Sequence, residues 1–190
     1  MLEASGIPAP IAKAMSDKGY ENLTPVQEEV YKDDYSGLDL LVSAQTGSGK
    51  TIAFGLAIVE NILSDNSFFK TPKSPEALII VPTRELALQV KNELSWLLAS
   101  LEAKIVSCVG GMDIRTERRN LETKPNIVVG TPGRLKDHIE RNHYQGCDEH
   151  SFRLASVCLS SQLSSLSLFT QSWCHAACRS GWPISCYASY

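Results

Sequence analysis

A glycine-rich run of eight residues near the start of the chain has the residue types of a phosphate-binding loop: Ala44-Gln45-Thr46-Gly47-Ser48-Gly49-Lys50-Thr51. Gly47 and Gly49 allow a tight turn in which successive backbone N–H groups point at phosphate oxygens. Lys50 can reach the β- and γ-phosphates, and the hydroxyl of Thr51 can bind Mg²⁺. The general pattern begins with glycine, and Ala44 stands in that place. The run predicts a site for a nucleoside triphosphate and Mg²⁺.

The flanking sequence supplies the elements that such a loop needs, namely a buried strand before it and a helix after it. The segment 39–44 is a short apolar run that predicts the strand, and residues 51–63 are apolar enough for a buried helix. Downstream, apolar strand patterns alternate with helical periodicity, which predicts an α/β fold with a parallel sheet and right-handed crossovers. We expect further strands at 77–81, 104–109 and 126–129, helices beginning at 83 and 131, an exposed polar helix over 113–123, and two helices within the first thirty residues.

Every candidate functional segment directly follows one of the predicted strands. Polar or glycine-rich sequence begins after Ala44, Val81, Val109 and Val129. Because ligands of open parallel sheets bind at the carboxyl ends of the strands, these segments are expected to form one active surface.

Five segments together resemble the conserved motifs of the DEAD-box ATP-dependent RNA helicases. The phosphate loop, with alanine leading, is similar to motif I of that family, and residues 19–27 resemble its Q motif. The run 82–86 resembles motif Ia, Gly110-Gly111 the glycine doublet, and 131–135 the next RNA-contacting motif. The five segments follow in the family's order over residues 2–142.

This resemblance implies an N-terminal RecA-like three-layer domain that uses ATP and Mg²⁺ and binds RNA through its backbone with little sequence preference. Lys50 and Thr51 would be catalytic, with Thr51 on the metal. A planar amide such as that of Gln27 can both donate to and accept from the adenine edge. Besides the loop itself, the implied nucleotide-binding residues are Tyr20 and Gln27.

For RNA, the resemblance implies contacts at the strand-to-helix junctions and at the glycine doublet. Helix N-termini expose N–H groups that suit phosphate. Either arginine of the set could instead be solvated or ion-paired. The implied RNA-binding residues are Pro82, Thr83, Arg84, Gly110, Gly111, Thr131, Pro132, Gly133 and Arg134.

The chain departs from the family pattern at two places. Leu2 stands where an aromatic residue would stack on adenine, which predicts weaker nucleotide binding. The acidic motif Asp-Glu-Ala-Asp, which holds Mg²⁺ and orients water, should follow an apolar strand after the helix that contains Arg134. The only candidate, Asp148-Glu149, has no apolar strand before it and is followed by His150 and Ser151.

Composition changes abruptly near residue 144. The segment 144–190 is rich in serine and cysteine and has few charged residues. We therefore expect an incomplete domain at 1–143 and an irregular tail at 144–190, disordered or aggregation-prone. A shifted reading frame, an aberrant splice or read-through would explain the change, and the DNA frame would test this. A zinc site from Cys174, His175, Cys178 and Cys186 is disfavoured by its spacing.

The overall composition excludes several classes of protein. A net charge of −3 and a pI near 5.8 argue against binding nucleic acid through a basic tail alone. No apolar run approaches a transmembrane length, and the N-terminus lacks signal-peptide features. The expectation is a monomeric cytoplasmic protein, or a nuclear or nucleolar one if the source is eukaryotic.

Two alternatives to an active helicase domain stay open at this point. The first is a non-catalytic nucleotide- or RNA-binding module, or a truncated pseudo-helicase, for which RNA binding would not depend on nucleotide. The second is another P-loop enzyme, such as a nucleotide kinase or transport ATPase. Gln27 and the segment 131–134 argue against the second alternative.

Overall fold

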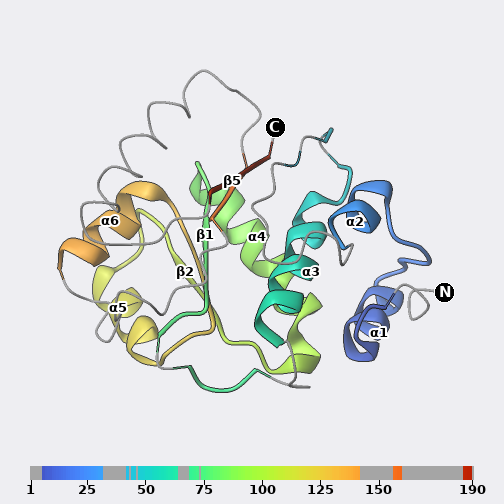
Figure 1. Cartoon of the computed structure of the whole chain (residues 1–190). Coiled ribbons are helices and arrows are strands. Elements are labelled where there is room, and N and C mark those ends of the chain that lie inside the picture. The colour runs from blue at the N-terminus through green and yellow to red at the C-terminus, as the bar shows by residue number, and fades with distance from the viewer. Residues whose placement is uncertain are drawn as a thin grey trace.

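The protein is described here by a computed structural model, which covers residues 6–31, 42, 44–45, 47–63, 69–72, 74–141, 156–159 and 186–189. Its centre is a parallel sheet of β1 (Ala77–Ile80), β2 (Ile105–Cys108) and β3 (Ile127–Gly130) in the order β1-β3-β2 (Figure 1). In the registers, Ala77 and Ile105 both pair with Ile127, and Ile80 and Cys108 both pair with Gly130. The carboxyl ends of the three strands therefore lie level at one edge.

Helices connect and cover these strands, as expected for βαβ units. Their bounds are α1 (Ala9–Asp17), α2 (Pro25–Val30), α3 (Lys50–Leu63), α4 (Arg84–Leu97), α5 (Ile114–Glu122) and α6 (Pro132–Glu140), with a short 3-10 turn η3 (Ala99–Leu101) after α4.

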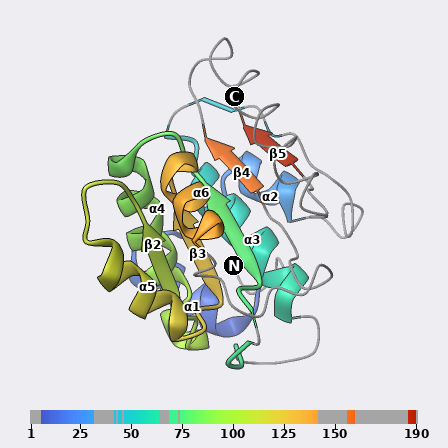
Figure 2. The same ribbon diagram turned by 90° about the vertical axis from the view of Figure 1, so that its left-hand side faces the viewer.

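Two apolar cores on opposite faces of the sheet make the fold three-layered. On one face Ile79, Ile127 and Val129 pack with residues of α1, α3 and α4. On the other face the neighbouring strand residues pack against Leu121 of α5 and Leu135 of α6. This alternation follows from the two-residue period of a strand. Figure 2 shows α5 and α6 on the face opposite α3.

Buried Asn126 joins the segments at the amino ends of the strands. Its Oδ1 accepts from the backbone N–H of Lys104 (3.0 Å), and its Nδ2 donates to Lys70 O and to Glu76 Oε2, both at 2.8 Å. With a partner for each polar atom, the amide can be buried at little cost.

Side-chain caps begin two of the helices. Thr83 Oγ1 accepts from the N–H of Leu86 at the start of α4 (3.3 Å). The carboxylate of Asp113 accepts from the backbone N–H groups of Arg115 (3.2 Å) and Thr116 (3.3 Å) at the start of α5. The hydrogen bond from the Arg115 N–H, supported by that from the Thr116 side chain, lowers the pKa of Asp113.

Two further strands lie in the C-terminal segment. β4 (Ser156–Leu159) and β5 (Cys186–Ser189) pair in parallel, and β4 lies beside β1. Our sequence analysis did not anticipate either strand.

The predicted parallel α/β fold is confirmed, including the helix over 113–123, which is found at Ile114–Glu122. Of the strand predicted at 39–44, only Val42 and Ala44 are among the described residues, so that strand stays a prediction. Among the helices that the structure describes, none has the length and apolarity needed to span a membrane.

Gly130 provides a test of the packing at the carboxyl end of β3. A Cβ at this position would lie 2.7 Å from the carbonyl oxygen of Cys108 and 2.7 Å from Leu135 Cδ2. We expect Gly130→Ala to lower the free energy of unfolding by about 1–3 kcal/mol, because backbone and helix must shift to admit the methyl group. The measurement is urea unfolding followed by circular dichroism.

The matched control is Gly133→Ala in α6, where an added Cβ meets nothing within 4 Å. This control should leave stability unchanged or raise it by up to about 1 kcal/mol, as alanine is favoured over glycine in helices. Equal stability of the two variants would contradict the packing described.

Candidate functional site

The described part of the phosphate loop forms a turn that leads directly into α3. Gly47 and Gly49 have φ of +80° and +83°, a region that other residues rarely adopt, and α3 begins at Lys50. Its first turn contains Thr51. Thr46 lies outside the described residues, and its role stays a prediction.

The ammonium group of Lys50 lies against the loop. Its Nζ donates to the carbonyl oxygens of Ala44 and Gln45, the latter at 2.7 Å. These bonds hold the ammonium group beside the loop and near the N-terminus of α3. Both the ammonium group and the helix N-terminus favour anions.

The segment that resembles the Q motif packs directly on the phosphate loop. Thr24 Oγ1 donates to Ser48 O (2.9 Å), and Gln27 Nε2 donates to Gly49 O (3.2 Å). A Cβ on Gly49 would lie 2.4 Å from Gln27 Nε2, so glycine is required there for contact as well as for φ. Two successive loop carbonyls are thus held by α2 and its N-cap residue.

The amide of Gln27 has a different environment from the one the resemblance implies. The residue is fully buried, and its Oε1 accepts from the N–H of Thr24 (3.0 Å) while its Nε2 bonds Gly49 O. Both ends of the amide therefore bond the chain itself. Its predicted contact with the adenine edge is untested by these interactions.

Tyr20 stacks on the indole ring of Trp96 in α4. The ring centroids are 6.2 Å apart at an interplanar angle of 17°, and Lys18 Nζ lies 5.6 Å from the centroid of Trp96. In this position Tyr20 fixes the turn between α1 and α2 against α4. Leu2 lies outside the described residues.

The candidate RNA-binding segments meet at the carboxyl edge of the sheet. Thr83 and Arg84 follow β1, and the guanidinium of Arg84 lies on the backbone of Gly111, where a Cβ would be 2.4 Å from Nη1. Thr131 is the N-cap residue of α6, and its N–H donates to Cys108 O (3.1 Å). The structure thus brings together the start of α4, the glycine doublet and the start of α6.

The other predicted RNA-binding residues at this edge are mostly exposed to solvent. Pro82, Gly110 and Gly133 are exposed, and an added Cβ at Gly110 or Gly133 would meet nothing within 4 Å. Pro132 is the first residue of α6, where its missing N–H costs no helix hydrogen bond. A phosphate backbone could approach these positions closely.

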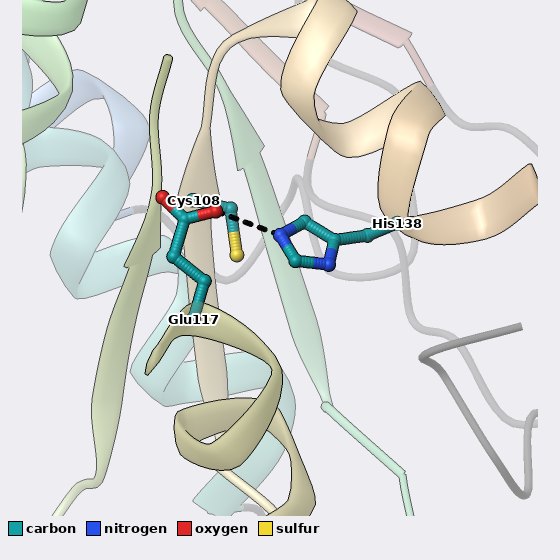
Figure 3. Close-up of side chains that lie close together, drawn as sticks. All are labelled: Cys108, Glu117 and His138. Atoms are coloured by element: carbon teal, nitrogen blue, oxygen red, sulfur yellow. Dashed lines mark hydrogen bonds and ion pairs between the residues drawn. The ribbon is translucent and has the colours of Figure 1, made fainter. Parts of the chain in front are cut away.

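Arg134 is ion-paired rather than solvated. Its Nε lies 2.7 Å from Glu117 Oε2, and its Nη2 donates to Met112 O. The same carboxylate oxygen lies 2.7 Å from Nε2 of buried His138 (Figure 3). The sequence analysis missed Glu117, although its spacing from Ile114 and Leu121 places it on the apolar face of the helix.

The acidic motif was expected directly after the strand that follows α6, and the next strand that the structure describes is β4. This strand lies beside β1 and is followed in sequence by Ser160 and Ser161, and the chain contains no aspartate or glutamate after Glu149. Asp148 and Glu149 precede β4 and lie outside the described residues.

Comparisons with known proteins agree with this arrangement. The chain is 43% identical over 137 residues to the ATP-dependent RNA helicase CshA of Limosilactobacillus reuteri, covering 72% of this chain and 26% of that protein. It is 44% identical over 133 residues to CshA of Bacillus subtilis (69% and 25% covered) and 41% identical over 137 residues to DeaD of Escherichia coli (72% and 21% covered). The chain thus spans about a quarter of the length of these relatives.

A solved structure and a family model extend the similarity beyond residue 143. A hypothetical ATP-dependent RNA helicase from Sulfolobus tokodaii matches 95% of this chain with 49% of its own, at a TM-score of 0.73 and 26% identity. The model of the DEAD/DEAH box helicase family matches residues 24–154. With most of its length in that match, the chain belongs to the DEAD/DEAH box helicase family.

Proposed function

We propose that this chain is the ATP- and RNA-binding part of an ATP-dependent RNA helicase and that ATP binding at the phosphate loop is coupled to binding of RNA. The observation that carries the nucleotide half is the packing of Gln27 and Thr24 on the loop through Gly49 O and Ser48 O. Gln27 and Gly49 are twenty-two residues apart in the sequence, and their hydrogen bond supports the proposal that the two segments belong to one site.

The residues around the loop fit ATP and Mg²⁺. Ser48 Oγ is a buried hydroxyl without a hydrogen-bond partner among the described residues, which a ligand oxygen would satisfy. Lys50 can exchange its carbonyl partners for phosphate oxygens, and the Thr51 hydroxyl in the first turn would hold Mg²⁺. When bound, the metal neutralises charge on the β- and γ-phosphates.

In this proposal, the nucleotide-binding residues are those named from the sequence, with Gln27 and Tyr20 in supporting positions. Gln27 would hold the loop in place, because its amide accepts from the N–H of Thr24 and donates to the carbonyl oxygen of Gly49. Tyr20 holds the preceding turn against Trp96. These two bonds use one N–H and one lone pair of the amide, and the proposed selection of adenine would use the second N–H and the second lone pair.

The RNA half of the proposal rests on helix N-termini that meet at one edge. The first turns of α4 and α6 have N–H groups without helical partners, and they follow the strands beside Arg84 and the glycine doublet. These groups suit the sugar-phosphate chain and offer little that distinguishes one base from another. We infer contacts with single-stranded or locally melted RNA.

Hydrolysis is a separate question, because it needs an acidic group across the metal from Thr51. No carboxylate side chain follows Glu149, and Ser160 and Ser161 come after β4. This observation favours a second candidate function, a module that binds nucleotide and RNA without turnover. We propose that this chain alone binds ATP and does not hydrolyse it at a useful rate.

The nucleotide site is tested with Lys50→Ala and a fluorescent ATP analogue titrated in the presence of Mg²⁺. We expect the dissociation constant to rise by about ten- to hundredfold, the effect of losing a charge-assisted hydrogen bond of about 1.5–3 kcal/mol. Lys13→Ala is the control, since Lys13 lies exposed on α1. Equal affinities of the two variants would argue against the site.

The RNA surface is tested with Arg84→Gln and a labelled single-stranded RNA. A direct phosphate contact predicts weaker binding and a salt dependence, log K against log salt concentration, that is shallower by about 0.7. Arg118→Gln is the control, because Arg118 is paired with Glu122 on the exposed face of α5 at 2.8 Å. An unchanged slope in Arg84→Gln would remove Arg84 from the interface.

Turnover is tested by measuring phosphate release from ATP with and without RNA. We expect the 190-residue chain and its Lys50→Ala variant to show the same background rate, because no carboxylate follows β4 to orient water. RNA-stimulated turnover that Lys50→Ala abolishes would contradict this expectation and favour a complete catalytic site.

A further inference from the structure

Glu117 is a carboxylate buried beneath the candidate RNA surface. Only 1% of its side chain is exposed, although Ile114 and Leu121 are the only apolar residues of its helix. Burial of a carboxylate is costly unless each oxygen has partners. Because Glu117 is buried, it does not serve to make the helix soluble, and its position calls for a structural explanation.

The partners of Glu117 come from two different RNA-facing segments. Its Oε1 accepts from the backbone N–H of Val109 (2.9 Å), the residue directly before Gly110-Gly111. Its Oε2 lies 2.7 Å from Arg134 Nε and 2.7 Å from His138 Nε2, both on α6. Figure 3 shows the contact with His138. One side chain therefore connects the end of β2 to the helix that begins at the end of β3.

Arg134 closes this connection from the other side. While its Nε bonds Glu117, its Nη2 donates to the carbonyl of Met112, just after the glycine doublet. Its side chain is only 13% exposed, whereas Arg84 is an exposed residue. The guanidinium of Arg134 is thus directed at the protein, and its position relative to the doublet is set by two hydrogen bonds.

A metal ion is a less suitable explanation of the same cluster. Ligand atoms of Cys108, Glu117 and His138 lie within 4.8 Å of one another, a spacing at which zinc could bind. However, Glu117 Oε2 already bonds a guanidinium and an imidazole nitrogen. A divalent cation on this oxygen would be placed against the positive charge of Arg134.

We propose that Glu117 is a positioning residue for RNA binding, which holds the glycine doublet and the N-terminus of α6 at one fixed spacing. Arg134 acts through Glu117 and Met112 O as a second positioning residue and does not bind phosphate directly. This inference rests on the proposed RNA-binding function and deepens it. RNA phosphates are held by the backbone of these two segments together with Arg84.

An effect of charge alone and a positioning role predict opposite changes in RNA affinity when the charge of Glu117 is removed. A carboxylate below a phosphate-binding surface repels RNA, so charge alone predicts that Glu117→Gln binds RNA more tightly. Positioning predicts weaker binding, because an amide cannot accept from both Val109 and Arg134 while it keeps the His138 contact. The sign of the change therefore separates the two explanations.

The experiment measures RNA affinity by fluorescence anisotropy of a labelled oligouridine with the full 190-residue chain. For Glu117→Gln we expect a loss of about tenfold, with the affinity for an ATP analogue unchanged within about twofold, since the hydrogen-bond partners of Glu117 among the described residues are Val109, Arg134 and His138. The matched control is Glu122→Gln on the same helix, whose carboxylate is about half exposed (52%). This control should bind RNA as well as the unmodified chain or slightly better.

Arg134→Gln supplies a second measurement that does not depend on the folding of Glu117→Gln. A positioning role predicts weaker RNA binding with an unchanged salt slope, in contrast to the decrease of about 0.7 expected for a phosphate ligand. Together with Glu117→Gln, the double variant should lose less affinity than the two single losses combined, because both substitutions break one network.

The possible outcomes are distinct. Tighter or unchanged RNA binding by Glu117→Gln, a shallower salt slope for Arg134→Gln, or stoichiometric zinc that Glu117→Gln removes would each overturn this inference and leave the proposed function intact. Failure of the unmodified chain to bind RNA would overturn the RNA half of the proposed function, and this inference with it. Parallel losses of RNA and nucleotide affinity would show general destabilisation and overturn the positioning role.

Discussion

Parallel pairing in register of β1, β3 and β2 is the constraint that places the candidate RNA-binding segments beside one another. Because Ile80 and Cys108 both pair with Gly130, the residues that follow the three strands leave the sheet at the same level. Polar groups that are distant in sequence thereby become neighbours. Gly130 and Gly111 both allow close approaches at this edge, since an added Cβ would meet Cys108 O and Leu135 at Gly130, and Arg84 at Gly111.

A second close approach, between Gly49 and Gln27, positions α2 against the candidate phosphate loop. Glycine is needed at residue 49 for its positive φ and again because Gln27 occupies the space of a Cβ. The carbonyl oxygen of Ser48 accepts from Thr24 Oγ1, and that of Gly49 accepts from Gln27 Nε2 as well as from the N–H of Ala53 (3.0 Å). The start of α2 therefore packs directly on the candidate phosphate loop, and the preceding turn is held against α4 by the stacking of Tyr20 on Trp96.

Much of this arrangement could be predicted from the sequence, since it depends on local patterns. Apolar runs predicted β1, β2 and β3, and periodicity together with capping residues predicted the helices that follow them. The environments of polar side chains could not be predicted in this way. Both Gln27 and Arg134 have residue types that suit a ligand, yet each bonds partners within the chain that are separated in sequence, as Arg134 bonds Glu117.

Glu117 shows most clearly why local patterns are insufficient. A glutamate within a polar helix predicts a solvated side chain, and the spacing from Ile114 to Leu121 was the one sign of burial. Whether a carboxylate on that face is tolerable depends on Val109, Arg134 and His138, which only the tertiary fold brings together. The candidate RNA surface and the candidate phosphate loop also differ in their acidic groups. At the candidate RNA surface the buried carboxylate of Glu117 bonds Val109, Arg134 and His138. The candidate phosphate loop has Lys50 and the hydroxyl of Thr51, and the sequence contains no aspartate or glutamate after Glu149. The proposed binding of ATP and RNA therefore uses groups that the described residues contain, whereas the acidic group expected for hydrolysis is not among the residues that follow β4.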